Sequence, residues 1–301
     1  MREMVLHIGA AKTGSTSLQK FVFQAVPDLH HFGEVGDGTT ETSEERILWS
    51  LYGDDDSFYN ADMARTLFSN HQGLADGRNL VFSSADVLAR GTPSRTASRL
   101  RAIVGQDAQV LLVVRNQVTA LSSFYAGHGA WLKPAPKPFF RRYVSPRSWM
   151  EFQWEVESDS VLRQFLYWEC LQPFVGHFGA SNCHVVTFEG LVGGDLQSWT
   201  TISRLLGCGP EECFRAFSSG QERNRITRGQ MALGRLMGAL DPWHSPPDVR
   251  SLKWASLGGM YTPNWPSGEI ERLSAYFGPG NRELSKETGL DLAQFSYPGV
   301  A

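Results

Sequence analysis

The sequence predicts an α/β fold, with helices flanking a central parallel sheet and a C-terminal part rich in helices and loops. Two observations lead to this prediction. Short apolar runs alternate with segments whose apolar residues recur at helical spacing, which is typical of a parallel sheet with crossover helices. One run, QVLLVV at residues 109–114, is almost wholly apolar, as in a parallel strand covered on both faces. Because no change of composition divides the chain, we expect a single domain over residues 1–301.

The first third begins with an expected strand at residues 4–8, a turn of small residues at 9–14 and a helix at 15–26. Apolar side chains at helical spacing predict that helix. Residues 33–63 are rich in Gly, Asp, Glu and Ser, so we expect mostly loop there, with a short helix near residues 44–51.

The middle of the chain is expected to contain strands at residues 79–82 and 109–114, with a helix at 94–104 between them. Ser94 and the glycine that follows this helix are suitable caps for its two ends. Asn116, just after the second of these strands, opens a further helix.

Residues 130–150 are expected to form an insertion or lid on the substrate side. Residues 130–148 contain four prolines and five Lys or Arg residues, which does not fit a core element. Beyond this segment we expect a long amphipathic helix at residues 159–178, a strand at 184–188 and a helix at 195–206. The proline inside the long helix is expected to kink or break it.

Composition limits the class of protein. Lys and Arg number 28 and Asp and Glu number 31, a net charge of −3, so no overall charge favours nucleic acid or an anionic membrane as a partner. The sequence has no apolar run of about 18 residues and no signal-peptide pattern at its start. The four cysteines form no CxxC pair, so we expect reduced thiols in a cytoplasmic enzyme without a membrane span.

The most informative stretch is VLHIGAAKTGSTSLQ, which is typical of a strand, a turn with two glycines and the start of a helix. Gly9 and Gly14 have the separation of a P-loop. Ser15 follows Gly14, however, where an ATP-binding P-loop has Lys, and Lys12 lies inside the turn instead. The third expected strand ends in Arg115 rather than in an acid that could hold Mg²⁺. These departures disfavour an ATP-dependent small-molecule kinase, which stays the alternative enzyme.

Such a turn can still hold a phosphate group. Backbone N–H groups converge at the start of a helix and favour an anion there. Four hydroxyls beside Gly14 add donors: Thr13, Ser15, Thr16 and Ser17. Lys12 would reach the bridging oxygen of a leaving group. The structural alternative is an ordinary strand, turn and helix with a lysine that faces solvent.

The segment KTGSTSLQ (residues 12–19) resembles the 5′-phosphosulfate loop of sulfotransferases that use 3′-phosphoadenosine 5′-phosphosulfate (PAPS). In that family a second motif follows a later strand: an Arg, a Ser eight positions on, and then an aromatic residue. VVRNQVTALSSFY has this spacing, with Arg115, Ser123 and Tyr125. The resemblance implies that Arg115 and Ser123 hold the 3′-phosphate of PAPS and of its product, adenosine 3′,5′-bisphosphate (PAP). Arg suits this role because it binds phosphate through charge-assisted hydrogen bonds.

The resemblance covers about residues 4–208 and is densest in these two motifs. A weaker third similarity is VVTFEGLV, in which Glu189 either belongs to an FExL segment seen in bacterial members or caps a strand end. Gln117 and Thr119 depart from the family, in which Pro and an acid are common at these places. Neither departure touches the expected phosphate contacts.

A basic cluster, ERNRITRG, lies in the C-terminal third, where the resemblance is poor. Arg225 and Arg228 of this cluster are candidates for closing over the adenine and the 3′-phosphate of PAPS. A solvated basic loop is the structural alternative.

The resemblance leaves open which residue takes the proton from the acceptor. Family members use a Glu shortly after the first helix, or a His or acid just after the second strand. Glu34 in HHFGEVGDG fits the first description and is our first candidate, Asp86 in FSSAD is the second, and His128 is the third. A carboxylate base would need a raised pKa to act near neutral pH. For each of the three, an ordinary loop charge or histidine is the structural alternative.

These features predict a PAPS-dependent sulfotransferase of bacterial type, with a fold similar to that of P-loop nucleotide kinases. It would transfer a sulfuryl group to a hydroxyl or amine of a small-molecule or glycan acceptor. No metal is expected, because the adjacent His30 and His31 do not suit one ion. Three tryptophans near the insertion offer faces for a sugar: Trp131, Trp149 and Trp154. A nucleotide-binding homologue without catalysis is the other alternative, and the sequence predicts neither the acceptor nor the oligomeric state.

Overall fold

The computed structural model describes residues 4–33, 43–53, 55–89, 92–129, 144–156, 159–220, 226–240, 249–266 and 268–300. The chain divides into two compact units. Unit 1 comprises residues 1–116, 164–222 and 277–301, and unit 2 comprises residues 117–163 and 223–276. Unit 1 holds the sheet, and the described part of unit 2 consists of helices and loops.

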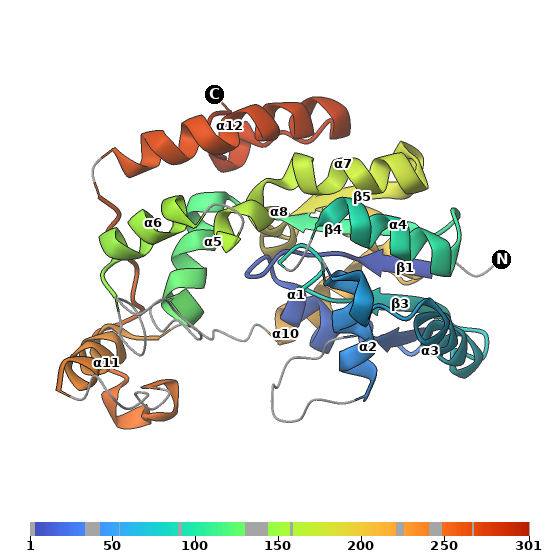
Figure 1. Ribbon diagram of the computed structural model, residues 1–301, viewed down its shortest axis with the longest axis horizontal. Helices are drawn as coiled ribbons and strands as arrows, with labels where there is room; N and C mark the ends of the chain where they lie inside the picture. Colours follow the sequence, from blue (N-terminus) through green and yellow to red (C-terminus); the bar gives the residue numbers. More distant parts are fainter. Residues whose placement is uncertain are drawn as a thin grey trace. The chain divides into compact units, whose positions relative to one another are not determined.

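Unit 1 is built on a five-stranded parallel sheet (Figure 1). In chain order the strands are β1 (Met4–His7), β2 (Leu29–Phe32), β3 (Asn79–Ser83), β4 (Gln109–Val114) and β5 (Cys183–Thr187). They lie in the order β2-β3-β1-β4-β5, and each neighbouring pair is parallel. The predicted α/β class with a parallel sheet is confirmed. The loop that follows the central strand β1 therefore opens at the carboxyl edge of the sheet, where α/β proteins bind ligands.

The edge strand β2 is an element that the sequence analysis did not predict. Its letters LHHF place two histidines between two apolar residues, and only Leu29 and Phe32 are buried. That pattern shows neither alternation nor an apolar run. Pairing with β3, which sets Leu29 opposite Asn79 and Phe32 opposite Phe82, makes this segment a strand.

The helices of unit 1 are α1 (Ser15–Leu18), α2 (Ser43–Tyr52), α3 (Ala61–Leu74), α4 (Pro93–Val104), α7 (Tyr167–Phe178), α8 (Phe188–Gly193), α9 (Leu196–Leu206) and α10 (Pro210–Ser219), with α12 (Glu269–Thr288) starting in unit 2. Of these, α2, α4 and α9 begin and end within one residue of the predicted boundaries. Short 3-10 turns lie at η2 (Asp56–Phe58), η6 (Ala180–Asn182) and η9 (Ala293–Phe295). Asp195 caps α9 as predicted by accepting a hydrogen bond from the N–H of Ser198 at 2.8 Å.

Three predicted elements differ in detail. The helix expected at residues 15–26 is α1 followed by a π-helical segment, η1 (Gln19–Phe23). The helix expected at residues 159–178 is a 3-10 segment, η5 (Val161–Phe165), followed by α7, which continues through its proline. The last strand stops one residue early, because the hydroxyl of Thr187 accepts the N–H of Gly190 at 3.1 Å and begins α8.

An apolar cluster in the core of unit 1 lies between the sheet and the helical elements α1, η1, α8, α9 and α10. Its large buried rings are Phe23 of η1, Trp199 of α9 and Phe217 of α10. The ring centroids of Trp199 and Phe217 lie 5.3 Å apart. Because η1 is part of this cluster, the residues just after the phosphate loop are fixed to the core.

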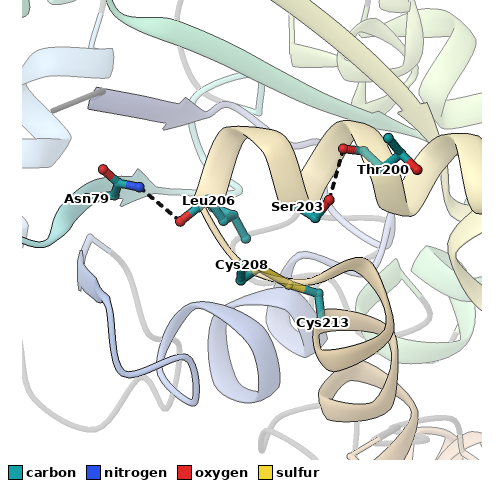
Figure 2. Close-up of a disulfide and its surroundings, with 6 residues drawn as sticks. All are labelled: Asn79, Thr200, Ser203, Leu206, Cys208 and Cys213. Atoms are coloured by element: carbon teal, nitrogen blue, oxygen red, sulfur yellow. Dashed lines mark hydrogen bonds between the residues drawn. A yellow bond between two sulfur atoms is a disulfide. The ribbon is translucent and has the colours of Figure 1, made fainter. Parts of the chain in front are cut away.

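A disulfide joins Cys208 and Cys213 (Figure 2), with a Cα–Cα distance of 6.8 Å. The prediction of reduced thiols is wrong for this pair, whereas Cys170 and Cys183 are in no disulfide and keep their thiols. Gly207, with a φ of 73°, ends α9. Cys208 follows in the turn before α10 and Cys213 lies near the start of α10, so the bridge spans the beginning of that helix. The spacing of the cysteines in the sequence did not predict this disulfide.

Unit 2 contains α5 (Gln117–Phe124), α6 (Pro146–Glu155) and α11 (Arg228–Leu240), with short segments η3 (Tyr125–Gly129), η7 (Val249–Ser251) and η8 (Lys253–Ala255). Its centre is aromatic. The rings of Tyr125, Trp149 and Trp265 contact one another at centroid distances of 5.7 to 5.9 Å. Trp149 is fully buried in this cluster, so the expectation that it stacks on an acceptor is wrong.

The predicted insertion at residues 130–150 is only partly described. Residues 130–143, with Trp131, lie outside the described residues, and α6 begins at Pro146 after its N-cap Ser145. Trp154 on α6 is covered on one face by the guanidinium of Arg272, 4.1 Å from the ring centroid. Among the helices that the structure describes, none is long and apolar enough to cross a membrane.

Candidate functional site

The loop after β1 is closed by its own hydroxyls. Thr13 donates from Oγ1 to the carbonyl of Ala10 at 2.8 Å, and Ser15 donates from Oγ to the same carbonyl at 3.3 Å. Lys12 and Gly14 have left-handed φ values of 66° and 91°, which a lysine rarely adopts. Thr13 and Ser15 are buried. These two hydroxyls therefore shape the loop.

The other two hydroxyls of the motif reach the surface. Thr16 is exposed and Ser17 is partly exposed, on the first turn of α1. The sequence analysis treated all four hydroxyls alike. The structure divides them into an inner pair that holds the loop and an outer pair that can meet a ligand.

The loop is also held by a side chain that the sequence analysis missed. Gln164 of η5 accepts a hydrogen bond at Oε1 from the N–H of Ala11, 3.1 Å away. Gln164 is buried and lies 153 positions from Ala11 in the sequence. No local pattern could indicate this contact, because it depends on how η5 packs in the folded unit.

The second motif meets the loop through Arg115. β4, which ends at Val114, lies beside β1 in the sheet, so Arg115 emerges next to the loop. Its Nη1 donates to the carbonyl of Lys12 at 2.9 Å, and its side chain is mostly buried. The structure thus brings Lys12 and Arg115 together, as the two motifs predict.

Phe188 lies against both motifs. The Arg115 guanidinium carbon is 4.5 Å from its ring centroid, a cation–π contact. On the loop side, a Cβ added to Gly14 would be 2.8 Å from Cδ2 of Phe188, so only glycine fits beneath the ring. The sequence analysis placed Phe188 at a strand end and did not identify this role.

The backbone around Arg115 is fixed by buried side chains. The phenol of Tyr167 accepts the Arg115 N–H at 3.1 Å and donates to the Arg115 carbonyl at 2.8 Å. Burial raises the pKa of Tyr167 well above its ordinary value, so the phenol keeps its proton. The carboxylate of Glu189 accepts the N–H of Asn116 at 3.0 Å and the phenol of Tyr297 at 3.0 Å. The third, weaker motif therefore braces the second.

His7, the last residue of β1, lies beneath the loop and is fully buried. Its Nδ1 is 2.7 Å from the hydroxyl of Ser83, which also accepts a hydrogen bond from the amide of Gln19 at 2.9 Å. His7 Nδ1 and the Ser83 hydroxyl therefore share one hydrogen bond, whose donor depends on the tautomer of the ring. Burial, aided by the charge of His31, lowers the pKa of His7 to about 3.

Gly9 is the residue that makes room for this histidine. A Cβ at position 9 would lie 2.7 Å from Ser15 Oγ and 2.9 Å from His7 Nε2. Nε2 is enclosed and has no hydrogen-bond partner among the described residues. The sequence signal for His7 is a polar residue in an otherwise apolar strand, which the sequence analysis did not use.

The three base candidates are placed unequally. Asp86 lies in the turn after β3 and is partly buried, with its N–H 3.2 Å from the hydroxyl of Ser84. Ser84 in turn donates its N–H to the His7 carbonyl at 3.2 Å, so this turn borders the loop. Glu34 lies outside the described residues, and for His128 only the backbone, in η3 of unit 2, is described.

The remaining predicted donor contacts belong to unit 2. Ser123 is partly buried on α5. Arg228 is exposed at the start of α11, and its N–H donates to the Gly259 carbonyl at 3.0 Å. Arg225 lies outside the described residues.

A search for metal ligands finds no group of three or more His, Cys, Asp or Glu side chains within the described part of the chain. His30 Nε2 lies instead 3.0 Å from Nδ1 of His71. One of these two rings must donate to the other, which fits a hydrogen-bonded pair on the surface of the sheet.

Comparison with known proteins gives structural matches only. No family model matches the chain, and no curated protein does. The chain is similar to a sulfotransferase from Alicyclobacillus acidocaldarius, with 16% identity over 98% of each chain and a TM-score of 0.55. It also matches the sulfotransferase domain of the Synechococcus PCC 7002 olefin synthase (13% identity, 96% of each chain, TM-score 0.43). A third match is mouse sulfotransferase SULT7A1 complexed with PAP (12% identity, 95% of this chain and 82% of the other, TM-score 0.40). At these identities the likeness concerns the fold, and over nearly its whole length the chain has the fold of a sulfotransferase.

Proposed function

We propose that this protein is a PAPS-dependent sulfotransferase of bacterial type. The observation that carries the proposal is the hydrogen bond from Arg115 to the Lys12 carbonyl. It joins the two phosphate-binding motifs, 103 positions apart in the sequence, at the carboxyl edge of the sheet. The sulfotransferase fold supports the same proposal. A kinase would need a lysine after Gly14 and an acid directly after β4, and this sequence has Ser15 and Arg115 at those positions.

The donor would be held at its two phosphate-bearing ends. Thr16 and Ser17 would donate to the 5′-phosphosulfate, with backbone N–H groups at the start of α1 adding to them. Thr13, Gly14 and Ser15 would keep the loop in shape. In this proposal Arg115 and Ser123 bind the 3′-phosphate, and Arg225 and Arg228 close over the nucleotide.

The reaction would be an in-line displacement at sulfur. The acceptor oxygen or nitrogen forms a bond to sulfur while the bond from sulfur to the 5′-phosphate oxygen breaks, and PAP leaves. Lys12 would neutralise the charge that develops on the leaving oxygen. The acceptor proton passes to a base, for which Glu34 stays the first candidate, ahead of Asp86 and His128. No metal has a role in this mechanism.

The first experiment is calorimetric binding of PAP, AMP and ATP, each with and without Mg²⁺. We expect tight binding of PAP that needs the 3′-phosphate and no metal. Preference for ATP with Mg²⁺ would favour the kinase instead. Tight PAP binding without turnover on any acceptor would favour a non-catalytic homologue, and no binding at all would reduce the loop to a structural turn.

Variants then separate binding from catalysis. Lys12→Ala should lower turnover by about 10²- to 10³-fold, the usual effect of removing a group that stabilises developing negative charge. Lys20→Ala, on the helix that follows the loop, is the matched control and should keep most of the activity. Glu34→Gln should lower turnover and leave PAP affinity unchanged, whereas normal turnover would pass the role of base to Asp86 or His128.

A further inference from the structure

Unit 2 contains a cation that has no acidic partner among the described residues. Arg235, near the middle of α11, is partly buried. Within the described part of the chain its hydrogen bonds run from Nη2 to the phenol oxygens of Tyr125 and Tyr261, both at 3.1 Å. The exposed Arg147 of the same unit, by contrast, contacts the carboxylate of Glu151 at 2.8 Å. A partly buried guanidinium without a counter-charge is unfavourable unless a ligand supplies one.

Arg235 has N–H groups that do not donate to the described residues. Tyr125 donates its own proton to the carbonyl of Val144, so its oxygen can only accept from Arg235. Tyr261 also accepts from Arg235, and its hydroxyl lies beside that of Tyr125. Arg235 retains the N–H groups on Nε and Nη1, and neither atom is among the enclosed polar atoms of the structure. A group of spare donors around one positive charge is suited to an oxyanion.

The donors are set in a rigid aromatic frame. The Arg235 guanidinium carbon lies 5.5 Å from the ring centroid of Tyr261, and the Tyr125 and Tyr261 centroids lie 6.2 Å apart. Trp265 is held by a hydrogen bond from Nε1 to the hydroxyl of Ser122 at 3.1 Å. Tyr125 is fully buried, whereas Tyr261 and Trp265 are partly exposed. The frame thus combines partly exposed ring surface with a positive charge and hydrogen-bond donors.

Hydrogen bonding with Tyr125 and Tyr261 also raises the pKa of Arg235, although burial alone would lower it. The guanidinium is therefore charged at every pH at which the protein is folded.

We propose that Arg235, beside Tyr261, binds the carboxylate of a flat molecule. This carboxylate site does not rest on the proposed function. The flat part of the molecule packs against the partly exposed rings of Tyr261 and Trp265, while its carboxylate meets the donors of Arg235.

The test uses benzoate as the probe and benzamide as its neutral match, in the full chain, with affinity measured by NMR titration. In the parent we expect benzoate to bind at least about tenfold more tightly than benzamide. Arg235→Gln should abolish this preference, and Tyr261→Phe, which removes one hydroxyl, should weaken it severalfold. Arg147→Gln, an exposed arginine of the same unit, is the control and should keep the parent preference.

Two results would overturn the site: a parent that binds benzoate no better than benzamide, or a preference that survives in Arg235→Gln. Should Arg235→Gln fail to fold, Tyr261→Phe carries the test alone, and an unchanged preference there contradicts the proposal.

PAP affinity, measured on the same samples, separates this inference from the proposed function. We expect it to be equal in the parent and in Arg235→Gln within twofold. Loss of PAP binding in Arg235→Gln would assign Arg235 to the donor and refute the carboxylate site. Benzoate binding as expected in a parent that binds no PAP would refute the proposed function and leave the carboxylate site standing.

Discussion

Arg99 in unit 1 and Arg235 in unit 2 are both withdrawn from water but are held in opposite ways. Arg99 donates from Nη1 to three backbone carbonyls, those of Ser50, Leu51 and Gly53, and from Nη2 to the carboxylate of Asp56. Its guanidinium also lies 4.3 Å from the ring centroid of Tyr59. Arg235 contacts two phenols and no carboxylate in the described residues. Both terminal nitrogens of Arg99 are bound by the chain, whereas the hydrogen bonds of Arg235 to the described residues run through Nη2 alone.

The number of hydrogen bonds to the protein distinguishes a structural arginine from one that can bind a ligand. A guanidinium that donates to several protein oxygens holds loops in place, because removing it leaves buried carbonyls without a donor. A guanidinium with unused donors can still accept a ligand. His7 lies between these cases, since Nδ1 is satisfied by Ser83 and Nε2 is not.

The largest expected effect is the loss of stability when Arg99 is replaced. Arg99→Met should lower the free energy of unfolding by about 3 to 5 kcal/mol, because it leaves three carbonyls without a donor. Arg235→Gln should change it by no more than about 1 kcal/mol. Urea denaturation of both variants and the parent measures this, and similar losses in the two would remove the distinction.

A smaller effect is expected for His7 and depends on pH. Its pKa is about 3 in the folded protein against 6.5 as its ordinary value. Between pH 6.5 and about pH 3, His7 is protonated in the unfolded chain but not in the folded protein. The free energy of unfolding therefore falls as the pH falls through this range. At pH 5 this single group lowers the free energy of unfolding by about 2 kcal/mol relative to pH 7.

His7→Gln removes this contribution. Urea denaturation at pH 7 and pH 5 should show that the variant loses about 2 kcal/mol less than the parent between the two pH values. His177→Gln, whose ring on α7 is partly exposed, should keep the parent's dependence. An identical pH dependence in His7→Gln and the parent would mean that the His7 ring is not enclosed as the structure has it.

The strands and the phosphate loop could be predicted because their signals are local. A run such as QVLLVV is buried on both faces wherever it lies in the chain, and the Gly9 to Gly14 spacing is read within one turn. Strand β2 could not be predicted, since its histidines fit an edge strand only once β3 lies beside it.

The supports of the site were missed for a related reason. Phe188 over Gly14, Gln164 on Ala11 and Tyr297 on Glu189 join residues that are far apart in the sequence. A single sequence does not contain such pairings, because they arise from the packing of elements. The choice of base is still a prediction for the same reason, as it depends on which loop side chain reaches the acceptor.

The smallest expected effect concerns the disulfide, which is bonded within the chain and offers no group to a ligand. Cys213 is buried in the core cluster and Cys208 is at its edge. Thiol counting on unfolded protein should give two thiols without reductant, from Cys170 and Cys183, and four after reduction.

Reduction should lower the free energy of unfolding by at most about 2 kcal/mol, because a bridge between cysteines five positions apart closes a short loop and restrains the unfolded chain only modestly. Urea denaturation with and without a phosphine reductant measures this, with Cys170→Ser as a control that should respond to reductant as the parent does. PAP affinity should stay within twofold, since the bridge joins the turn after α9 to α10 and contributes no donor to the loop. Four thiols in the untreated protein would mean that the bridge does not form. A large fall in PAP affinity on reduction would instead show that α10 sets the shape of the phosphate loop through η1.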